Sequence, residues 1–480
     1  MPNKLLLLIL IISLVLGSSI LTRGHQWGDD FAWYILQAKS IVDSTTDEFM
    51  EQSAFTNYQS TQHLGPLAYP WGYPLILAPM YALKGISPLA LKLPALFFFA
   101  GFLICLYFLA KDRLTKTETL LLVSLFAFNP LLLRFLDQIL SDIPFLFFST
   151  LALLLMVREG RHGSTHYALI GASIFFTTIL RVTGILLLGC FLIVEFFRLL
   201  NNRQDRTAVM EIIKNSLVVC FVFAVFWIVN SLLFPSGGES YFSQYSGLIE
   251  TARAFAVAYF NVFSQFFGET AGWKYLYYFV LIFFLLGAWE RRKKETVFLL
   301  FFVLWLMIHL TYPWWQGPRY VFPLLPIFIY FAFQGMKVVI RKLPERYHPA
   351  SQTVFYGFWL LIAGIFLFTS SRSAYANLQN DRAINGPFDP YSTEVYNYIK
   401  EKTPPDSVVV FFKPRVMVIM TEHPTIMSTE CDRMYKGDYI VLSRKVGKNQ
   451  QITPEEIDAC NLPLDQVLKN NRFIVYQLQK

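Results

Sequence analysis

The chain has 480 residues, of which 55% are hydrophobic and 47 are phenylalanine. This composition excludes an ordinary soluble globular protein and is typical of a chain that folds in lipid. The formal net charge of +8 does not indicate a nucleic-acid partner, because the basic residues form short clusters between apolar segments rather than one basic face.

Eleven apolar stretches predict an all-α polytopic membrane protein with about 11 transmembrane helices. A perpendicular span needs about 20 residues, and several of the stretches are shorter. They lie at residues 5–22, 89–110, 119–135, 143–157, 167–180, 183–199, 215–234, 274–289, 296–312, 320–336 and 352–370.

The basic residues predict an orientation for this bundle. With a cytoplasmic N-terminus, the cytoplasmic loops carry clusters such as residues 291–294, whereas the opposite short loops hold isolated cations. Because the number of spans is odd, the C-terminal tail is then extracytoplasmic. We expect the protein to lie in a bacterial plasma (inner) membrane. The first stretch also resembles a cleavable signal peptide, but its apolar run continues through Leu21, which favours an uncleaved helix.

The first outer loop, residues 23–88, is the longest interruption of the apolar pattern and too long for a mere connector. Apolar residues recur at helical spacing from Phe31 to Val42 and predict a helix along the membrane surface, with Asp30 in a capping position. Residues 63–74 are rich in Pro, Gly and aromatic side chains and predict an ordered irregular segment at the membrane interface. A second outer loop, residues 235–273, is a candidate flap over the site.

The composition changes after residue 370. We therefore divide the chain into a transmembrane domain at 1–370 and a small extracytoplasmic α/β domain at 371–480. In the second domain we expect a helix near 393–400 and short strands at 408–412, 439–442 and 473–476.

Two of the five cysteines, Cys431 and Cys460, lie in this tail. Whether they form a disulfide is open, because it depends on an oxidising compartment. The other three lie in apolar stretches and are interpreted as packing residues.

Two adjacent carboxylates, Asp29 and Asp30, follow the first apolar stretch, at a position where carboxylates are costly unless they have a function. A carboxylate at the outer membrane face suits the deprotonation of an acceptor hydroxyl or amine that attacks an activated sugar. We therefore predict Asp29 and Asp30 as catalytic residues. The structural alternative is that Asp30 only caps the helix that follows.

A phosphate leaving group departs without a general acid, so such a site needs a cation to stabilise the developing negative charge. Arg319 lies at the outer end of one span, and Arg181 lies at the turn between the fifth and sixth apolar stretches. Both are candidate donor-phosphate ligands. The alternative for both is that they only anchor helix ends among lipid headgroups.

Four further residues are candidates for the substrate cavity: Tyr69, Tyr73, Asp142 and Tyr320. Asp142 either orients a sugar hydroxyl or caps the fourth predicted span. Tyr69 and Tyr73 fit an interfacial aromatic belt better than a sugar platform, although both uses suit a ring with a polar edge.

Several motifs are absent from the sequence. It has no Walker P-loop, no dinucleotide fingerprint, no His-Glu-x-x-His and no Gly-x-Ser-x-Gly. No metal-ligand constellation is evident and no cofactor is predicted, while dependence on a divalent metal is open.

Five short segments share the predicted outer face. They are Gly28-Asp29-Asp30 with Tyr34 and Ala38, residues 69–74, residues 141–144, residues 181–184, and Arg319-Tyr320 with Pro323 and Pro326. In this order the set resembles the C-type (GT-C) superfamily of integral membrane glycosyltransferases, especially bacterial relatives of the protein O-mannosyltransferases and of the aminoarabinose transferase that modifies lipid A. The resemblance covers roughly residues 1–370.

The resemblance implies inverting transfer of a sugar from a polyprenyl-phosphate-linked donor to an envelope lipid, glycan or protein acceptor. It maps the acidic position of the family to Asp29-Asp30, with Asp29 preferred as the base. The Glu and Lys that aminoarabinose transferases carry before the loop proline are absent here, where Ala68 and Tyr69 stand nearby. Phosphate binding must then rest on Arg319 or another cation, and the identity of the donor does not carry over.

Two other classes of function compete with this reading. A transporter or flippase of a lipid-linked sugar would need the same cations and aromatic residues, but transporters usually place charges near the midplane, on broken helices in repeated halves. Neither feature is visible in the sequence. A nonenzymatic envelope scaffold is the other alternative. Replacing Asp29 and Asp30 by Asn distinguishes an enzyme from both alternatives, because only an enzyme should lose sugar transfer while folding normally.

Overall fold

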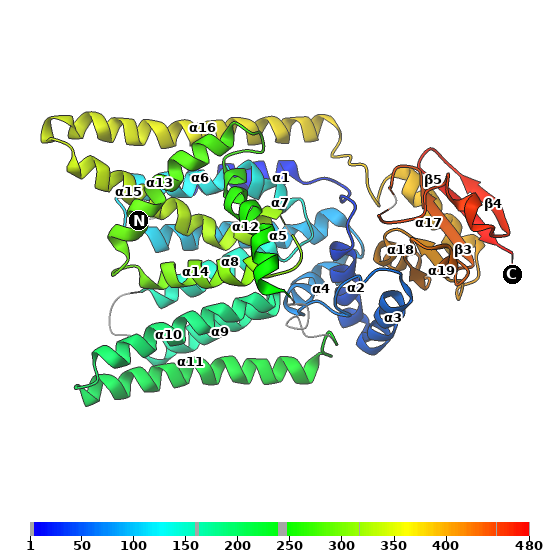
Figure 1. Cartoon of the computed structure of the whole chain (residues 1–480), viewed down its shortest axis with the longest axis horizontal. Coiled ribbons are helices and arrows are strands. Elements are labelled where there is room, and N and C mark those ends of the chain that lie inside the picture. Colours follow the sequence, from blue (N-terminus) through cyan, green and yellow to red (C-terminus); the bar gives the residue numbers. More distant parts are fainter. Residues whose placement is uncertain (1–3, 159–162, 239–246, 316, 448, 480) are drawn as a thin grey trace.

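The computed structural model describes the whole chain except residues 1–3, 159–162, 239–246, 316, 448 and 480. A bundle of helices forms one end of the molecule, and a smaller region with all the described strands forms the other (Figure 1). The bundle contains α1 (Lys4–Ile20), α5 (Pro88–Ala110), α6 (Lys116–Ala127), α7 (Pro130–Leu136), α8 (Asp142–Met156), α9 (Ser164–Leu180), η1 (Val182–Ile185), α10 (Leu186–Asn201), α11 (Arg206–Leu233), α13 (Trp273–Arg291), α14 (Thr296–Leu310), η4 (Gly317–Leu324), α15 (Leu325–Lys342), η5 (Glu345–Tyr347) and α16 (His348–Gln379).

The helical class predicted from composition is confirmed, and each predicted apolar stretch contains a helix. The count of eleven spans is not confirmed. Within the described residues, five helices are long and apolar enough to cross a membrane, or six if α6 and α7, which meet at a 52° bend, form one span. The shorter apolar helices α1, α8, α9 and α14 have 15 to 17 residues, fewer than the roughly 20 that a perpendicular span needs.

Glycine allows a close crossing of α13 and α15. A Cβ atom on Gly287 of α13 would overlap the carbonyl oxygen of Phe331 on α15, and one on Gly335 of α15 would overlap the carbonyl oxygen of Phe283 on α13. Small residues at such crossings let two backbones approach closely in lipid. The crossing holds α15 in place, and the preceding turn η4 carries Arg319.

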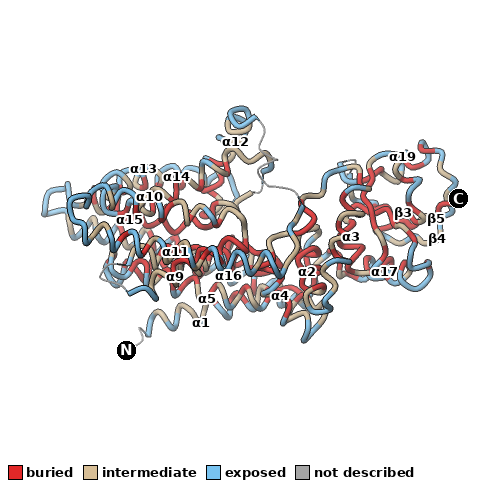
Figure 2. The backbone as a smooth tube through the Cα atoms, turned by 90° about the horizontal axis from the view of Figure 1, so that it is seen from below, coloured by how far each residue is buried: buried red, intermediate tan, exposed pale blue. Residues whose placement is uncertain are grey.

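The first outer loop folds into α2 (Asp30–Asp43), α3 (Thr46–Gln59) and α4 (Gly72–Lys84), joined by an irregular segment at 60–70. The predicted helix from Phe31 is confirmed as α2. Every residue from Phe31 to Ala38 is buried, because α2 lies between the bundle and the strand region (Figure 1). The second outer loop contains α12 (Leu248–Val262) and η3 (Phe263–Phe266), and α12 stands out from the body in Figure 2.

The C-terminal region combines a five-stranded sheet with short helices. Strand order is β2-β1-β3-β5-β4, with β1 parallel to β2 and β3, and β5 antiparallel to β3 and β4. The elements are α17 (Pro390–Lys402), β1 (Val409–Phe411), α18 (Pro414–Thr421), β2 (Thr425–Ile426), α19 (Cys431–Met434), β3 (Tyr439–Ser443), η6 (Ile457–Cys460), β4 (Leu464–Lys469) and β5 (Phe473–Leu478). The three predicted strands are β1, β3 and β5, whereas β2 and β4 were not predicted.

This region is tied to the bundle rather than tethered by a loop alone. The helix α16 continues to Gln379, past the predicted boundary at 370. Trp27, just before α2, packs on Phe412 with ring centroids 4.9 Å apart, so the core of the sheet continues into the first outer loop. A disulfide joins Cys431 to Cys460, which settles the pairing that the sequence left open.

Candidate active site

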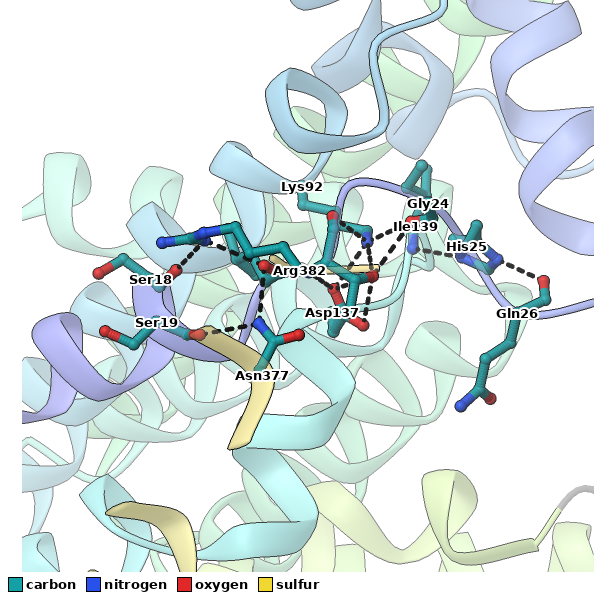
Figure 3. Close-up of polar contacts among 12 residues, drawn as sticks. Ser18, Ser19, Gly24, His25, Gln26, Lys92, Asp137, Ile139, Asn377 and Arg382 are labelled. Atoms are coloured by element: carbon teal, nitrogen blue, oxygen red, sulfur yellow. Dashed lines mark hydrogen bonds and ion pairs between the residues drawn. The ribbon is translucent and has the colours of Figure 1, made fainter. Parts of the chain in front are cut away.

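A buried lysine anchors the segment that leads to the two carboxylates. Lys92, near the start of α5, has no exposed side-chain surface, and its Nζ donates to Asp137 Oδ1 at 2.7 Å and to the carbonyl oxygen of Gly24 at 2.6 Å. The same Asp137 oxygen accepts from the backbone N–H of Thr22 at 2.6 Å. Figure 3 shows the contacts of Lys92 with Asp137 and Gly24. They fix the chain just before Asp29.

His25 adds a second anchor to this segment. Its Nε2 accepts from the backbone N–H of Ile139 at 3.1 Å, and its Nδ1 lies 2.7 Å from the carbonyl oxygen of Gln26 (Figure 3). These two partners require the neutral tautomer with the proton on Nδ1. Burial, assisted by the nearby Lys92 charge, lowers the pKa of His25 to about 3, against the raising effect of the Gln26 bond.

The end of α16 also holds the segment between α1 and α2. Asn377 donates to the carbonyl oxygens of Ser19 and Leu21 at 2.9 and 3.1 Å (Figure 3). Arg382 donates to the carbonyl oxygens of Ser18 and Leu21 at 2.8 and 3.0 Å. The backbone entering α2 is therefore tied to α5, α7 and α16 at once.

Asp30 is the first residue of α2 and one end of a chain of alternating charges. Its Oδ2 lies 3.2 Å from Arg319 Nη1, and its Oδ1 accepts from the Tyr69 hydroxyl at 2.7 Å. Behind it, Arg319 Nε lies 3.4 Å from Asp142 Oδ1, and Arg181 Nη2 contacts the same oxygen at 2.5 Å. Asp142 thus holds both arginines beside Asp30.

The two carboxylates differ in their electrostatics. Burial alone would raise the pKa of Asp30, but Arg319, the Tyr69 hydroxyl and Arg415 outweigh it, so the pKa lies below the usual value. Burial raises the pKa of Asp29, because Lys413, at 3.7 Å from Oδ2, and Arg415 compensate only partly. Asp30 is therefore the carboxylate that the site keeps ionised.

These groups border a cavity of about 360 Å³ that has both polar and apolar lining residues. The polar lining residues include Asp30, Tyr69, Arg181 and Arg319, together with Tyr34, His63, His309, Tyr312 and Tyr320. The apolar lining residues include Leu180, Val182, Ile185, Leu186 and Ile308, from the α9 to α10 turn and from α14. The cavity therefore suits an amphiphile with an anionic group and an apolar chain.

No protein-family model and no curated protein matches the sequence. Solved structures, in contrast, match nearly its whole length. ArnT from Cupriavidus metallidurans, bound to undecaprenyl phosphate, has a TM-score of 0.61 at 12% identity, covering 99% of this chain and 98% of that one. The archaeal oligosaccharyltransferase AglB from Archaeoglobus fulgidus has a TM-score of 0.58 at 12% identity, covering 92% and 69%. The arabinofuranosyltransferase AftD from Mycobacteria has a TM-score of 0.51 at 13% identity, covering 100% and 42%.

The chain has the C-type (GT-C) glycosyltransferase fold. This fold confirms the resemblance found in the sequence and makes the chain a multi-pass integral membrane protein. The match extends over the strand region as well, since ArnT covers 99% of this chain, whereas the sequence resemblance ended near residue 370.

Five of the eight predicted site residues line the cavity: Asp30, Tyr69, Arg181, Arg319 and Tyr320. The other three do not. Asp142 is buried behind the two arginines and makes no helix-capping bond. Tyr73 is fully buried with its ring edge-on to Tyr34 at 4.9 Å.

Asp29, the preferred base in the sequence analysis, is turned away from the cavity and towards Lys413. Successive side chains on a helix differ by about 100° in direction, so only one of two neighbours can face a given wall. Neither carboxylate caps α2: Asp30 lies inside the helix, and Asp29 holds the N-cap position without a side-chain bond.

Four residues that shape the site were not predicted from the sequence: His25, Lys92, Lys413 and Arg415. Lys92 carried a readable signal, since a lone lysine in an apolar stretch needs a partner. Lys413 and Arg415 flank Pro414 directly after a predicted strand, but nothing in the sequence linked them to the first outer loop.

Proposed function

We propose that this protein is an inverting glycosyltransferase that moves a sugar from a polyprenyl-phosphate donor to an envelope lipid, glycan or protein on the extracytoplasmic face of a bacterial plasma membrane. The observation that carries the proposal is the cavity itself. It brings Arg181 and Arg319 together with Asp30 and is also lined by apolar side chains, which matches a lipid phosphate beside a base. The proposed eleven spans with a cytoplasmic N-terminus would put this cavity at the outer face.

In the proposed reaction, Asp30 accepts the proton of an acceptor hydroxyl or amine as the acceptor atom attacks the anomeric carbon of the sugar. The bond from the anomeric carbon to the phosphate oxygen breaks on the opposite face, so the configuration inverts. Polyprenyl phosphate leaves with the bonding electron pair, and Arg319 and Arg181 stabilise the added charge. No general acid is needed.

Donor binding also changes Asp30 in this mechanism. Without donor, Arg319 lies between Asp30 and Asp142, 3.2 Å from the former and 3.4 Å from the latter. A bound phosphate attracts Arg319 away from Asp30, and the loss of a cation makes the carboxylate a stronger base. The base is thus activated when the donor is in place.

The experiment compares envelope glycolipids and glycoproteins by mass spectrometry in cells with and without the gene, complemented by variants. We expect wild type to restore a sugar-sized mass difference and Asp30→Asn to lose about 100-fold or more of the transfer rate. The matched control is Glu269→Gln, which removes an exposed carboxylate that pairs with the exposed Arg134 at the end of α7. Full activity of Asp30→Asn would reject Asp30 as the base.

Donor binding is tested separately on the purified protein with undecaprenyl phosphate as the probe. Arg319→Gln should weaken binding at least about tenfold, because a charge-assisted contact to the phosphate is lost. Arg134→Gln is the control, since Arg134 is exposed and does not line the cavity. Movement of a lipid-linked sugar across vesicles by the wild type, without any transfer, would instead establish the flippase alternative.

A further inference from the structure

Arg415 is a fully buried cation that the C-terminal region contributes to the edge of the site. It lies in the first turn of α18 and is 1% exposed. Its Nη1 donates to the Tyr69 hydroxyl oxygen at 3.0 Å, and its Nη2 donates to the carbonyl oxygen of Pro66 at 3.3 Å. The guanidinium also lies 4.6 Å from the centroid of the Trp33 ring. Figure 1 shows α18 close to α2 at the junction of the two regions.

The chemistry of these three groups fixes the direction of the hydrogen bonds. A guanidinium has donors only, so the Tyr69 oxygen must accept from Arg415. The single phenolic proton of Tyr69 is then free for one acceptor, and the Asp30 Oδ1 atom lies 2.7 Å away. The chain from Arg415 through Tyr69 to Asp30 therefore runs in one direction, and each bond polarises the next.

We propose that Arg415 is a positioning residue of the active site, which acts through Tyr69 to hold Asp30 ionised and with one oxygen turned to the cavity. This inference rests on the proposed function, in which Asp30 takes the proton of the acceptor. The relay occupies Oδ1, so Oδ2 is the oxygen that faces Arg319 and the cavity. Loss of the relay leaves the carboxylate free to rotate and easier to protonate.

Other groups around Asp30 also affect its charge. The charged neighbours are Arg319 from η4, Arg415 from α18, and Asp29 beside it in the chain. The neutral neighbours are His25, Tyr34 on the same helix, Tyr69, and Tyr312 after α14. Arg319 is the strongest favourable influence on the Asp30 pKa, with the Tyr69 hydroxyl and Arg415 next, so removing the relay should raise the pKa without abolishing the Arg319 effect.

Arg415 also packs on Trp33 and holds Pro66, so a truncation would disturb structure as well as charge. Three variants separate these roles. Arg415→Gln keeps a long side chain but can accept the Tyr69 proton. Arg415→Lys keeps a cation that can only donate. Tyr69→Phe keeps the ring and removes the relay without touching Arg415.

The experiment is an infrared titration of the full-length protein in detergent, which follows the protonated-carboxyl band that disappears in Asp30→Asn. We expect Arg415→Gln and Tyr69→Phe each to raise the midpoint by roughly one pH unit, as loss of a favourable partner does. The double variant should shift no further than either single one, and Arg415→Lys should lie near wild type. In transfer assays, the acid limb of the kcat/KM profile should move by the same amount.

The matched control is Arg433→Gln. Arg433 is another arginine of the C-terminal region that holds the first outer loop, through the carbonyl oxygens of Gln59 and Ser60. Among the described residues, it makes no hydrogen bond or ion pair with Tyr69 or Asp30. It should leave the midpoint unchanged. An unchanged midpoint in both Arg415→Gln and Tyr69→Phe would overturn the proposal, and if Arg415→Gln does not fold, Tyr69→Phe alone decides.

The infrared readout needs neither donor nor acceptor, so it distinguishes two failures. If the midpoints shift as expected but wild type transfers no sugar, the relay stands and the proposed function fails. If wild type transfers sugar but the midpoints do not move, the proposed function stands and Arg415 has only a structural role.

Discussion

The Lys92–Asp137 pair provides a stringent test of how the site is held. Lys92 is fully buried and Asp137 is 9% exposed, and Nζ lies within 3.1 Å of Asp137 Oδ1, the Gly24 carbonyl oxygen and both oxygens of Thr22. Replacing Lys92 by Met keeps a long side chain but leaves the Asp137 carboxylate without its cation. Breaking a buried pair in this way costs about 3 to 5 kcal/mol.

The assay is reversible unfolding of the purified protein in mixed micelles, which gives the free energy of unfolding. Arg23→Ala is the control, because the Arg23–Asp381 pair is exposed on both sides and should contribute only about 0 to 1 kcal/mol. Adding Asp137→Leu to Lys92→Met removes the unpaired charge, so part of the loss should be recovered. A loss below about 1 kcal/mol for Lys92→Met alone would refute the anchoring role, as would a double variant less stable than the single one.

Two further predictions concern stability. Burial lowers the pKa of His25 to about 3, whereas an unfolded histidine titrates near 6.5, so the unfolded chain binds one more proton between these values. The contribution of neutral His25 to the free energy of unfolding is therefore complete above about pH 6.5. It is lost by up to about 1.4 kcal/mol per pH unit as the pH falls towards 3. His25→Gln should flatten the dependence of Tm on pH in that range, and an unchanged slope would contradict the neutral tautomer. Gly287→Ala should destabilise by about 1 to 3 kcal/mol or more, because its Cβ would overlap the Phe331 carbonyl oxygen, whereas Gly364→Ala, with open space around it, should be neutral or slightly stabilising. Equal melting temperatures for these two alanine variants would contradict the close crossing.

Local patterns predicted the helices and five of the residues that line the cavity. Apolar runs determine where helices form in lipid, and α2 followed from its spacing of apolar residues. Arg181 and Arg319 stood out because a cation at the end of an apolar run needs a reason to be there. The spacing of apolar residues did not determine which of Asp29 and Asp30 faces the cavity. Apolar residues occur all around α2, so its periodicity did not mark the face that meets the cavity.

The parts that the sequence did not predict depend on contacts between distant segments. The relay joins Arg415 to Tyr69 across 346 positions, and no local signal encodes such a pairing. The burial of α2 has the same origin. The sequence shows that α2 is apolar, and only the fold shows that the bundle and the C-terminal region cover it.

The long separation between Tyr69 and Arg415 also sets an order of events during synthesis. At about 5 to 20 residues per second, the ribosome needs roughly 20 to 70 s to add the 346 positions between them. Throughout that interval the nascent bundle carries Asp30 without the partner that orients its tyrosine. The hydrogen bond from Arg415 to Tyr69 therefore forms only after all the residues that line the cavity, Asp30 to Tyr320, have been synthesised.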